Sequence, residues 1–264
     1  MPDPRNESST PPGHTRPMAV GRRGMLAGMA ALLTAGCTKI AETDTGSRVL
    51  GWADSWHRDA HRLLTGNGLV REYEVEDITP FFRGNGTTNP QNGDYQEQLA
   101  AGFANWRVPV RGLVRNELEL SLDDIRGLPQ RTQITRHDCV EGWSAIGQWT
   151  GPQLSTILDR AELLPEAEFI VFRCADNLNG DDYYESVDLV DAYHPQTIVA
   201  HQLNGEDLPV RNGAPLRMRV ERQLGYKQAK YLTAIEAVST LADIGEGHGG
   251  YWEDRSGYQW YAGM

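Results

Sequence analysis

Cys139 is the residue of this sequence whose surroundings point most directly to chemistry. It lies in the polar and aromatic run RHDCVEGWS (136–144), between an expected strand and an apolar segment that we expect to begin a helix. A structural cysteine usually has apolar neighbours. The two basic residues before Cys139 would favour a reactive thiolate, whereas the acidic residues on either side would oppose one. The local charge therefore leaves open whether this cysteine is functional or structural.

A second group of chemically suited residues lies further along the chain. The runs NGAPLRMR (212–219) and GYKQAK (225–230) combine glycines with basic side chains. Glycines let backbone N–H groups approach a ligand closely, and an Arg or Lys beside them can bind a phosphate through charge-assisted hydrogen bonds. This is the pattern of an anion-binding site. A basic strand pair whose charges simply face water would show the same pattern.

The beginning of the chain predicts export rather than fold. Residues 1–21 are rich in Pro, Ser, Thr and Gly, and Arg22 and Arg23 then precede an apolar run from Met25 to Ala35. That run is too short to span ~30 Å of hydrocarbon as a helix. It is typical of the apolar region of a signal peptide, and the paired arginines resemble a twin-arginine signal.

The same segment also resembles a lipoprotein signal. The run LTAGC (33–37) is similar to a lipobox that ends on the cysteine to be acylated. We therefore expect residues 1–36 to be an export signal, and the protein to be periplasmic or anchored to the periplasmic side of the membrane through Cys37. An ordinary cleaved signal or a retained anchor is the alternative.

The remaining chain alternates between helical and strand patterns. Residues 38–47 suit a tether, an amphipathic helix is predicted from Trp52 to Leu63, and residues 84–93 have the composition of a long loop. Strands are predicted at residues 106–110, 118–122, 133–135, 169–174, 197–203 and 216–220, and helices at 151–164 and 187–193. This interleaving predicts an α+β (mixed α/β) domain over 76–264, preceded by a tether and helix over 37–75.

The composition excludes several classes of partner. The 264 residues include 36 acidic and 25 basic side chains, for a formal net charge of −11. Nucleic acid would be repelled by this balance, so we expect no nucleic-acid binding. Three cysteines are too few for a disulfide framework. With Cys37 acylated, Cys139 and Cys174 remain, either as a structural disulfide or with one of them as a cofactor ligand.

Four ordered motifs resemble the sulfite oxidase family of molybdopterin enzymes. They are CVEGWS (139–144), HPQT (194–197), NGAPLR (212–217) and GYKQAK (225–230). The run FFRGNG (81–86) is similar to the Arg/Asn loop with which the family binds its pterin. The resemblance covers about residues 76–264 and implies the family's mixed sheets with interleaved helices.

The resemblance implies a mononuclear molybdenum, held by the two dithiolene sulfurs of a molybdopterin and by the thiolate of Cys139. Soft thiolate ligation fits this metal, and an Arg/Lys shell fits the pterin phosphate. By position, the residues that would hold the cofactor are Asn85, Cys139, Cys174, Asn212, Arg217, Gln228, Ala229 and Lys230. Cys174 stands where relatives often have Thr.

Catalytic residues follow from the same resemblance. Tyr183 lies eleven residues before His194, where the family places an active-site tyrosine whose phenol can hydrogen-bond an oxo group or a substrate oxygen. Ordinary packing of Tyr183 at a helix start is the alternative. Arg136 and Arg107 are candidates for a positive substrate pocket, because an oxyanion needs cationic donors in an otherwise acidic protein.

The predicted function is two-electron oxygen-atom transfer on a small oxyanion or S-oxide-type substrate. No haem-attachment motif and no Gly-rich dinucleotide fingerprint occurs, so we expect neither haem nor NAD in the chain. Electrons are expected to pass to or from a separate protein, itself a haem protein. One-domain members of the family include the periplasmic subunit that reduces methionine sulfoxide in proteins, and we expect a monomer of that type.

Two other functions use the same residues. A metal-free thiol enzyme would use Cys139 as nucleophile and His137 or His194 as base. A non-catalytic lipoprotein would merely retain the fold. His57 and His61 are spaced like two zinc ligands, but an Arg stands where the zinc-protease motif has Glu, so a solvated helix face is expected there.

Overall fold

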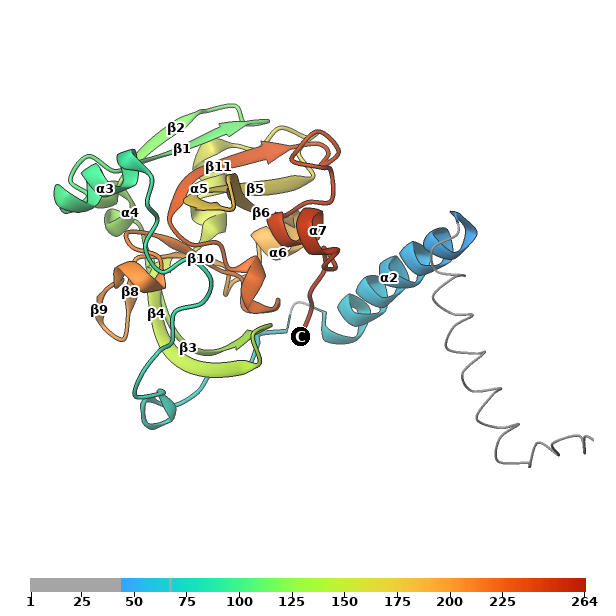
Figure 1. Ribbon diagram of the computed structural model, residues 1–264, viewed down its shortest axis with the longest axis horizontal. Coiled ribbons are helices and arrows are strands. Elements are labelled where there is room, and N and C mark those ends of the chain that lie inside the picture. The colour runs from blue at the N-terminus through green and yellow to red at the C-terminus, as the bar shows by residue number, and fades with distance from the viewer. Residues whose placement is uncertain (1–43, 67) are drawn as a thin grey trace, which may run out of the picture. The chain divides into compact units, whose positions relative to one another are not determined.

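The computed structural model describes residues 44–66 and 68–264, and its centre is a five-stranded mixed sheet (Figure 1). The strands lie in the order β2-β1-β11-β5-β6. Their bounds are β1 (Arg107–Gly112), β2 (Leu118–Ser121), β5 (Phe169–Leu178), β6 (Asp181–Asp188) and β11 (Leu232–Val238). β1 pairs with β11 in parallel, and the other neighbours are antiparallel. The predicted strands at 106–110, 118–122 and 169–174 are confirmed in this sheet.

A second sheet is built on a long hairpin. It contains β3 (Gln130–Cys139), β4 (Trp143–Pro152), β8 (Gln202–Leu203) and β9 (Glu206–Asp207), and a separate pair joins β7 (Ile198–Ala200) to β10 (Arg217–Arg219). The prediction that a helix begins after Cys139 is wrong, because the chain turns there and returns as β4. Burial alternates along β4 with a period of two, so its small apolar residues pack as a strand.

One long helix, α2, precedes the sheets, and the other helices and turns are short. The helices are α2 (Asp44–Thr65), α3 (Gly93–Ala100), α4 (Leu122–Gly127), α5 (Leu154–Ala161), α6 (Leu189–Ala192) and α7 (Tyr251–Ser256), and the 3-10 turns are η1 (Val75–Asp77), η2 (Val210–Asn212) and η3 (Gly225–Lys227). The predicted helix at 52–63 is longer than expected, and that at 187–193 is shorter because β6 continues to Asp188. Within the described ranges, no helix has the length and apolarity needed to cross a membrane.

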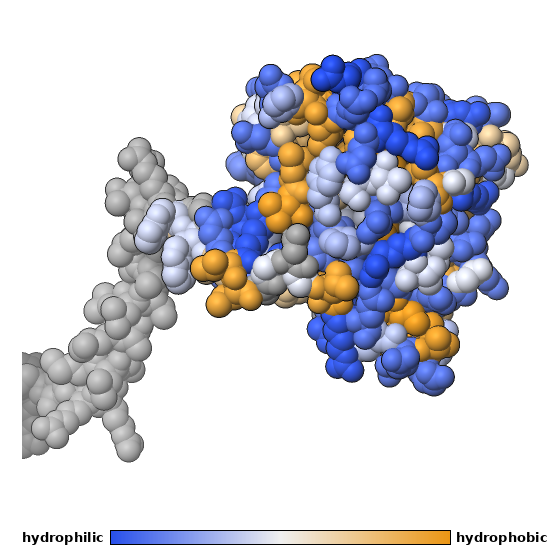
Figure 2. All heavy atoms as spheres, turned by 180° about the vertical axis from the view of Figure 1, so that it is seen from behind, coloured by the Kyte–Doolittle hydropathy of each residue, from blue (hydrophilic) through white to orange (hydrophobic). Residues whose placement is uncertain are grey.

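The chain divides into two units, residues 1–56 and 57–264, and the second holds all three sheets. Helix makes up 25% and strand 34% of the structure, which confirms the predicted α+β class. The view in Figure 2 shows a mostly hydrophilic surface with small, separated apolar patches, as the acidic composition leads one to expect. The export signal and Cys37 lie outside the described residues.

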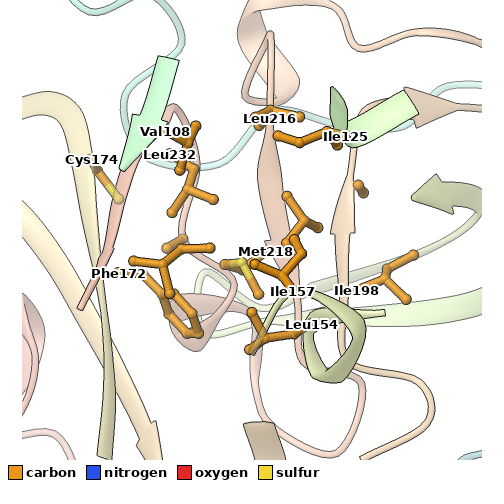
Figure 3. Packing of buried hydrophobic residues seen from close by; sticks show 14 of the residues in the cluster. Val108, Ile125, Leu154, Ile157, Phe172, Cys174, Ile198, Leu216, Met218 and Leu232 are labelled. Carbon is orange, nitrogen blue, oxygen red and sulfur yellow. The ribbon is translucent and has the colours of Figure 1, made fainter. Parts of the chain in front are cut away.

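The core fills the space between the sheets. Helix α5 buries Leu154, Ile157, Leu158 and Ala161 on one stripe, because residues three and four apart share a helix face. Figure 3 shows Leu154 and Ile157 close to Met218 of β10, with Phe172 of β5 nearby. This packing holds β10 against the central sheet, and β10 carries Arg217.

Candidate active site

Cys139 is positioned by the turn of the β3–β4 hairpin. It is the last residue of β3 and pairs with Trp143, while the Gly142 N–H donates to the Cys139 carbonyl over 3.0 Å. Gly142 has a φ of +85°, which a glycine adopts without strain. The Cys139 side chain is 9% exposed. The thiol is therefore held at a fixed place near the surface by backbone pairing on both sides.

Arg136 is not brought to Cys139. Successive side chains of a strand point to opposite faces, and along β3 Thr135, His137 and Cys139 are buried whereas Arg136 is exposed. Arg136 Nε instead donates to Asp138 Oδ2 over 2.9 Å. Arg136 therefore lies on the opposite face of β3 from Cys139, and its part in a positive substrate pocket stays a prediction.

The Cys139 thiol is protonated in the absence of a metal. Burial raises its pKa above the ordinary value, and Glu141 adds to this, while a backbone N–H and the charges of Arg217 and Lys230 act in the opposite direction. Among the residues described, neither His137 nor His194 hydrogen-bonds to the sulfur. A cysteine nucleophile needs a neighbouring base, so the geometry does not favour the thiol-enzyme alternative.

Arg217 is a buried cation aimed into the site. Its Nη1 donates to the Asn212 carbonyl over 2.9 Å and its Nη2 to the Gln228 carbonyl over 3.3 Å. The guanidinium lies 4.9 Å from the ring centre of Trp149, and its Nε has no hydrogen-bond partner in the described part of the chain. Burial lowers the Arg217 pKa to about 9, with a further contribution from Arg219. A fully buried cation without a carboxylate is suited to an anionic ligand.

Lys230 joins the loop FFRGNG (81–86) to the segment GYKQAK (225–230). Its Nζ donates to the Asn85 carbonyl over 2.5 Å and also to the carbonyl of Thr87. An isolated bridge pairs Lys230 with Arg217. Burial and the charge of Arg217 together lower the Lys230 pKa to about 7. The structure thus brings together three of the predicted cofactor residues, Asn85, Arg217 and Lys230.

The other predicted cofactor residues surround these. The Asn212 amide lies 3.5 Å from the Arg83 carbonyl, Gln228 Oε1 lies 3.4 Å from His137 Nδ1, and the Ala229 carbonyl accepts from the Met218 N–H over 2.7 Å. Cys174 lies on β5, and burial raises its pKa well above the ordinary value. Cys139 and Cys174 are both free thiols, so the disulfide alternative is wrong.

Tyr183 is a strand residue of β6 rather than a residue at a helix start. Its Oη donates to the Tyr226 carbonyl over 2.7 Å, and its ring stacks on Tyr251 with 5.5 Å between ring centres. Burial raises its pKa well above the ordinary value, so the phenol stays protonated. Tyr183 therefore contacts the segment that carries Gln228 and Lys230.

Sequence reasoning missed Asp176 and did not foresee the partner of His137. Asp176 is buried on β5, and burial raises its pKa to about 6 against the opposing charge of Lys230. His137 was considered only as a base, but Arg219 Nη1 lies 3.1 Å from its Nδ1. A charged residue directly after an apolar strand was the available signal for Asp176. The role of His137 depends on Arg219, which is 82 residues away in the sequence.

The residues fit an anionic cofactor. Three buried polar atoms in these segments have no hydrogen-bond partner among the described residues: Asn85 Oδ1, His137 Nε2 and Arg217 Nε. Buried polar atoms are almost always paired, so such a group indicates a ligand. A cavity of about 390 Å³ borders Cys174, and Arg107 lines it. The Cys139 thiol suits a metal, and the buried cations Arg217 and Lys230 suit a phosphate. Together with the unpaired polar atoms, these residues fit a metal–dithiolene cofactor that carries a phosphate.

Gly225 packs directly against His137. A Cβ at Gly225 would lie 2.5 Å from His137 Cε1 and 3.0 Å from the Asp138 carbonyl. We expect Gly225→Ala to lower the free energy of unfolding by about 1–3 kcal/mol, because overpacking forces a buried ring or backbone to move. Gly93→Ala is the control, because no atom lies within 4 Å of its Cβ position. Urea unfolding measures both, and equal stabilities would contradict this contact.

Lys230 should make the stability of the cofactor-free protein depend on pH. Its pKa of about 7 lies below the ordinary value of lysine, so above pH 7 the unfolded state binds more protons than the folded state. The free energy of unfolding of the wild type, compared with that of Lys230→Met, should therefore rise from about pH 7 to about pH 9. Thermal unfolding at a series of pH values tests this, and parallel curves would contradict it. Asp176 acts in the opposite direction at lower pH, because its pKa is raised.

Comparisons with known proteins show which family the chain belongs to. Residues 95–243 match the family described as "Oxidoreductase molybdopterin binding domain". The chain is 36% identical over 242 residues to a "putative protein-methionine-sulfoxide reductase subunit YedZ1" of Azospira oryzae, covering 92% of this chain and 86% of that protein. It is 31% identical over 192 residues to the "protein-methionine-sulfoxide reductase catalytic subunit MsrP" of Xanthomonas axonopodis pv. citri, covering 68% and 58%.

Among solved structures, the sulfane dehydrogenase SoxCD from Paracoccus pantotrophus superposes with a TM-score of 0.47 and 20% identity, covering 52% of this chain and 39% of that one. The domain match and the first relative define the class of protein. The chain belongs to the sulfite oxidase family and is a molybdopterin-binding oxidoreductase. The resemblance seen in the sequence is confirmed.

Proposed function

We propose that this protein is an exported molybdopterin-dependent reductase of methionine sulfoxide in proteins. The observation that carries the cofactor part is Cys139 at the hairpin turn, with the buried cations Arg217 and Lys230 acting on its sulfur. The substrate is supported by the two relatives, both of which are named as protein-methionine-sulfoxide reductase subunits. Export is supported by the paired arginines before the apolar run Met25–Ala35.

Each residue has a distinct task in binding the cofactor. Cys139 would give up its proton and bind the metal through its thiolate, which is a soft ligand. Arg217 and Lys230 would hold the phosphate, and Asn85, Asn212 and Gln228 would hydrogen-bond the pterin. When bound, the molybdenum centre supplies two-electron oxygen-atom transfer. Cys174 and Ala229 would line the pterin from β5 and from the segment after η3.

The reaction requires protons as well as electrons. Reduction of a sulfoxide to a thioether consumes two protons and two electrons and releases one water. We propose that a separate haem protein supplies the electrons, since the chain carries no haem-attachment motif. Tyr183 holds a proton on its Oη at neutral pH because burial raises its pKa. This phenol is the proposed proton donor to the departing oxygen of the substrate.

Metal content is the first test of this function. Protein matured in a host that makes molybdopterin should contain about one molybdenum per chain by elemental mass spectrometry, and oxidation should release the pterin. With a reduced dye as electron donor, it should then reduce an oxidised, methionine-sulfoxide-containing protein. Well-folded protein without molybdenum would contradict the cofactor assignment. Oxidation of sulfite without any sulfoxide reduction would contradict the substrate assignment.

A further inference from the structure

Behind Tyr183 lies a buried cluster of three charged groups that the proposed function does not use. Glu185 comes from β6, Lys227 from η3 and Glu253 from α7. Lys227 Nζ lies 2.6 Å from Glu185 Oε2 and 2.6 Å from Glu253 Oε1. All three side chains are at most 1% exposed. The cluster thus joins three elements directly beneath the segment GYKQAK (225–230).

The charges of this cluster do not balance unless one carboxyl is protonated. One ammonium group faces two carboxyl groups, and burial strongly disfavours an uncompensated negative charge. Burial raises the pKa of Glu185 well above its ordinary value, Lys227 opposes this shift, and Glu253 adds to it. Glu236 shows the reverse arrangement, because Arg111 and Arg173 both bind its one carboxylate.

The hydrogen bonds place the proton on Glu185. Tyr183 Oη lies 2.7 Å from the Tyr226 carbonyl and 3.3 Å from Glu185 Oε1. A phenol has one hydrogen, and a carbonyl oxygen only accepts, so that hydrogen goes to Tyr226. Glu185 Oε1 can then bond to Tyr183 Oη only by donating a hydrogen of its own. Glu253 remains the ionised partner of Lys227.

We propose that Glu185 is held as a neutral carboxylic acid and returns a proton to Tyr183 in each turnover. The step rests on the proposed function. The Tyr183 hydroxyl turns from the Tyr226 carbonyl to the departing substrate oxygen, and its O–H bond breaks as that oxygen takes the proton. The Glu185 Oε1–H bond then breaks to restore the phenol. The resulting Glu185 carboxylate is stabilised by Lys227 Nζ. Solvent reprotonates Glu185 and supplies the second proton, and the haem protein supplies both electrons.

Glu185 is thus a positioning residue that acts through Tyr183. The charged and titratable groups that face these two residues come from β5, β6, β10, η3 and α7. They are Cys174, Asp176, Tyr184, Arg217, Tyr226, Lys227, Tyr251 and Glu253. Arg217 acts on Tyr183, whereas Lys227 is the cation in direct contact with Glu185, so Lys227 is the group that stabilises Glu185 after the proton has left.

Infrared spectroscopy of the holoenzyme tests the protonation directly, without turnover. At neutral pH the wild type should show the C=O stretch of a protonated carboxyl group, and this band should shift in D2O. Glu185→Gln should remove the band. Glu236→Gln is the matched control and should keep it, because the pKa of Glu236 is lowered by its two arginines and its carboxylate is ionised. A band that persists in Glu185→Gln would overturn the proposal.

Turnover of a methionine-sulfoxide protein provides the second readout. Glu185→Gln should lower kcat by about 100-fold with KM unchanged, which is the scale of one general acid. The wild-type rate should fall as pH rises through the Glu185 pKa, and the variant should not show this fall. An unchanged rate and pH profile would overturn the proposal.

A second variant and the molybdenum content distinguish a failure of this proposal from a failure of the proposed function. If Glu185→Gln does not fold, Glu253→Gln replaces it: Glu185 becomes the single carboxylate of Lys227 and ionises, so the band should disappear, and its persistence would overturn the proposal. Molybdenum content should be equal in all variants. Absence of molybdenum in every protein would defeat the proposed function while the infrared band still reports on Glu185.

Discussion

Replacing Cys139 by alanine is expected to lower kcat for sulfoxide reduction by more than about 100-fold, while the protein stays folded. Loss of an outer-shell partner of a metal already costs about 10–100-fold, and loss of a direct ligand should cost more. The side chain lies at the end of β3 and is 9% exposed, and the hairpin is held by backbone pairing. Circular dichroism should therefore be unchanged, whereas molybdenum per chain and turnover should both fall.

Cys174→Ala is the matched control for this experiment. It also removes a free, buried thiol, but from β5 rather than from the hairpin turn. We expect the variant to retain its molybdenum and to lose less than about tenfold in kcat, because an outer contact contributes less than a ligand. If Cys139→Ala turns over at the wild-type rate, the assignment of Cys139 as the metal ligand is wrong. If Cys174→Ala alone loses the metal, the two cysteines have been assigned in the wrong order.

Replacing Arg219 by methionine is expected to lower the free energy of unfolding by about 3–5 kcal/mol, the usual cost of removing one partner from a buried ion pair. Arg219 Nε and Nη2 donate to the two carboxylate oxygens of Glu221 over 2.9 and 2.7 Å, and both side chains are 0% exposed. The guanidinium also lies 4.3 Å from the ring centre of Trp149. Methionine fills part of the volume but leaves the Glu221 charge without its cation.

Arg136→Met is the control for this second prediction. Arg136 also bonds a carboxylate, Asp138, over 2.9 Å, but it is 53% exposed. An exposed pair contributes less than about 1 kcal/mol because water and salt screen it. Urea unfolding of both variants measures the difference. Similar losses in the two variants would show that burial does not decide the contribution of Arg219.

Arg219 also contacts a residue of the candidate site. Its Nη1 lies 3.1 Å from His137 Nδ1, and His137 lies two residues before Cys139 on the same face of β3. Burial and the nearby arginines lower the pKa of His137 well below its ordinary value, so the imidazole is neutral. Arg219→Met should therefore also reduce the fraction of chains that hold molybdenum, because the imidazole beside the ligand loses its partner.

Much of the central sheet follows from local patterns in the sequence. The Leu-Glu-Leu-Ser alternation at 118–121 is a half-buried strand, and the apolar run from Phe169 is a buried one. The hairpin strand β4 could not be predicted in the same way. Its residues Ala145, Gly147 and Trp149 are small or aromatic, and only pairing with β3 decides that they alternate in a strand.

The site residues likewise differ in how far the sequence could predict them. Cys139, Asn85, Arg217 and Lys230 were identified from motifs, because each lies in a short run whose residue types match cofactor chemistry. Arg136 lies in such a run too, yet the period of the strand turns it away from Cys139. Side-chain direction depends on the element that a residue joins, so proximity in the sequence was a poor guide here.

The sequence by itself determined the family, the thiol and the basic residues of the cofactor segment, because motif chemistry is local. Only the tertiary structure decided which groups share one buried space. Lys230 joins a loop 145 residues earlier in the chain, and Glu185 meets Lys227 and Glu253 from three separate elements. The protonation of Glu185 depends on the charges that surround it after folding, and these charges come from residues that are distant in the sequence.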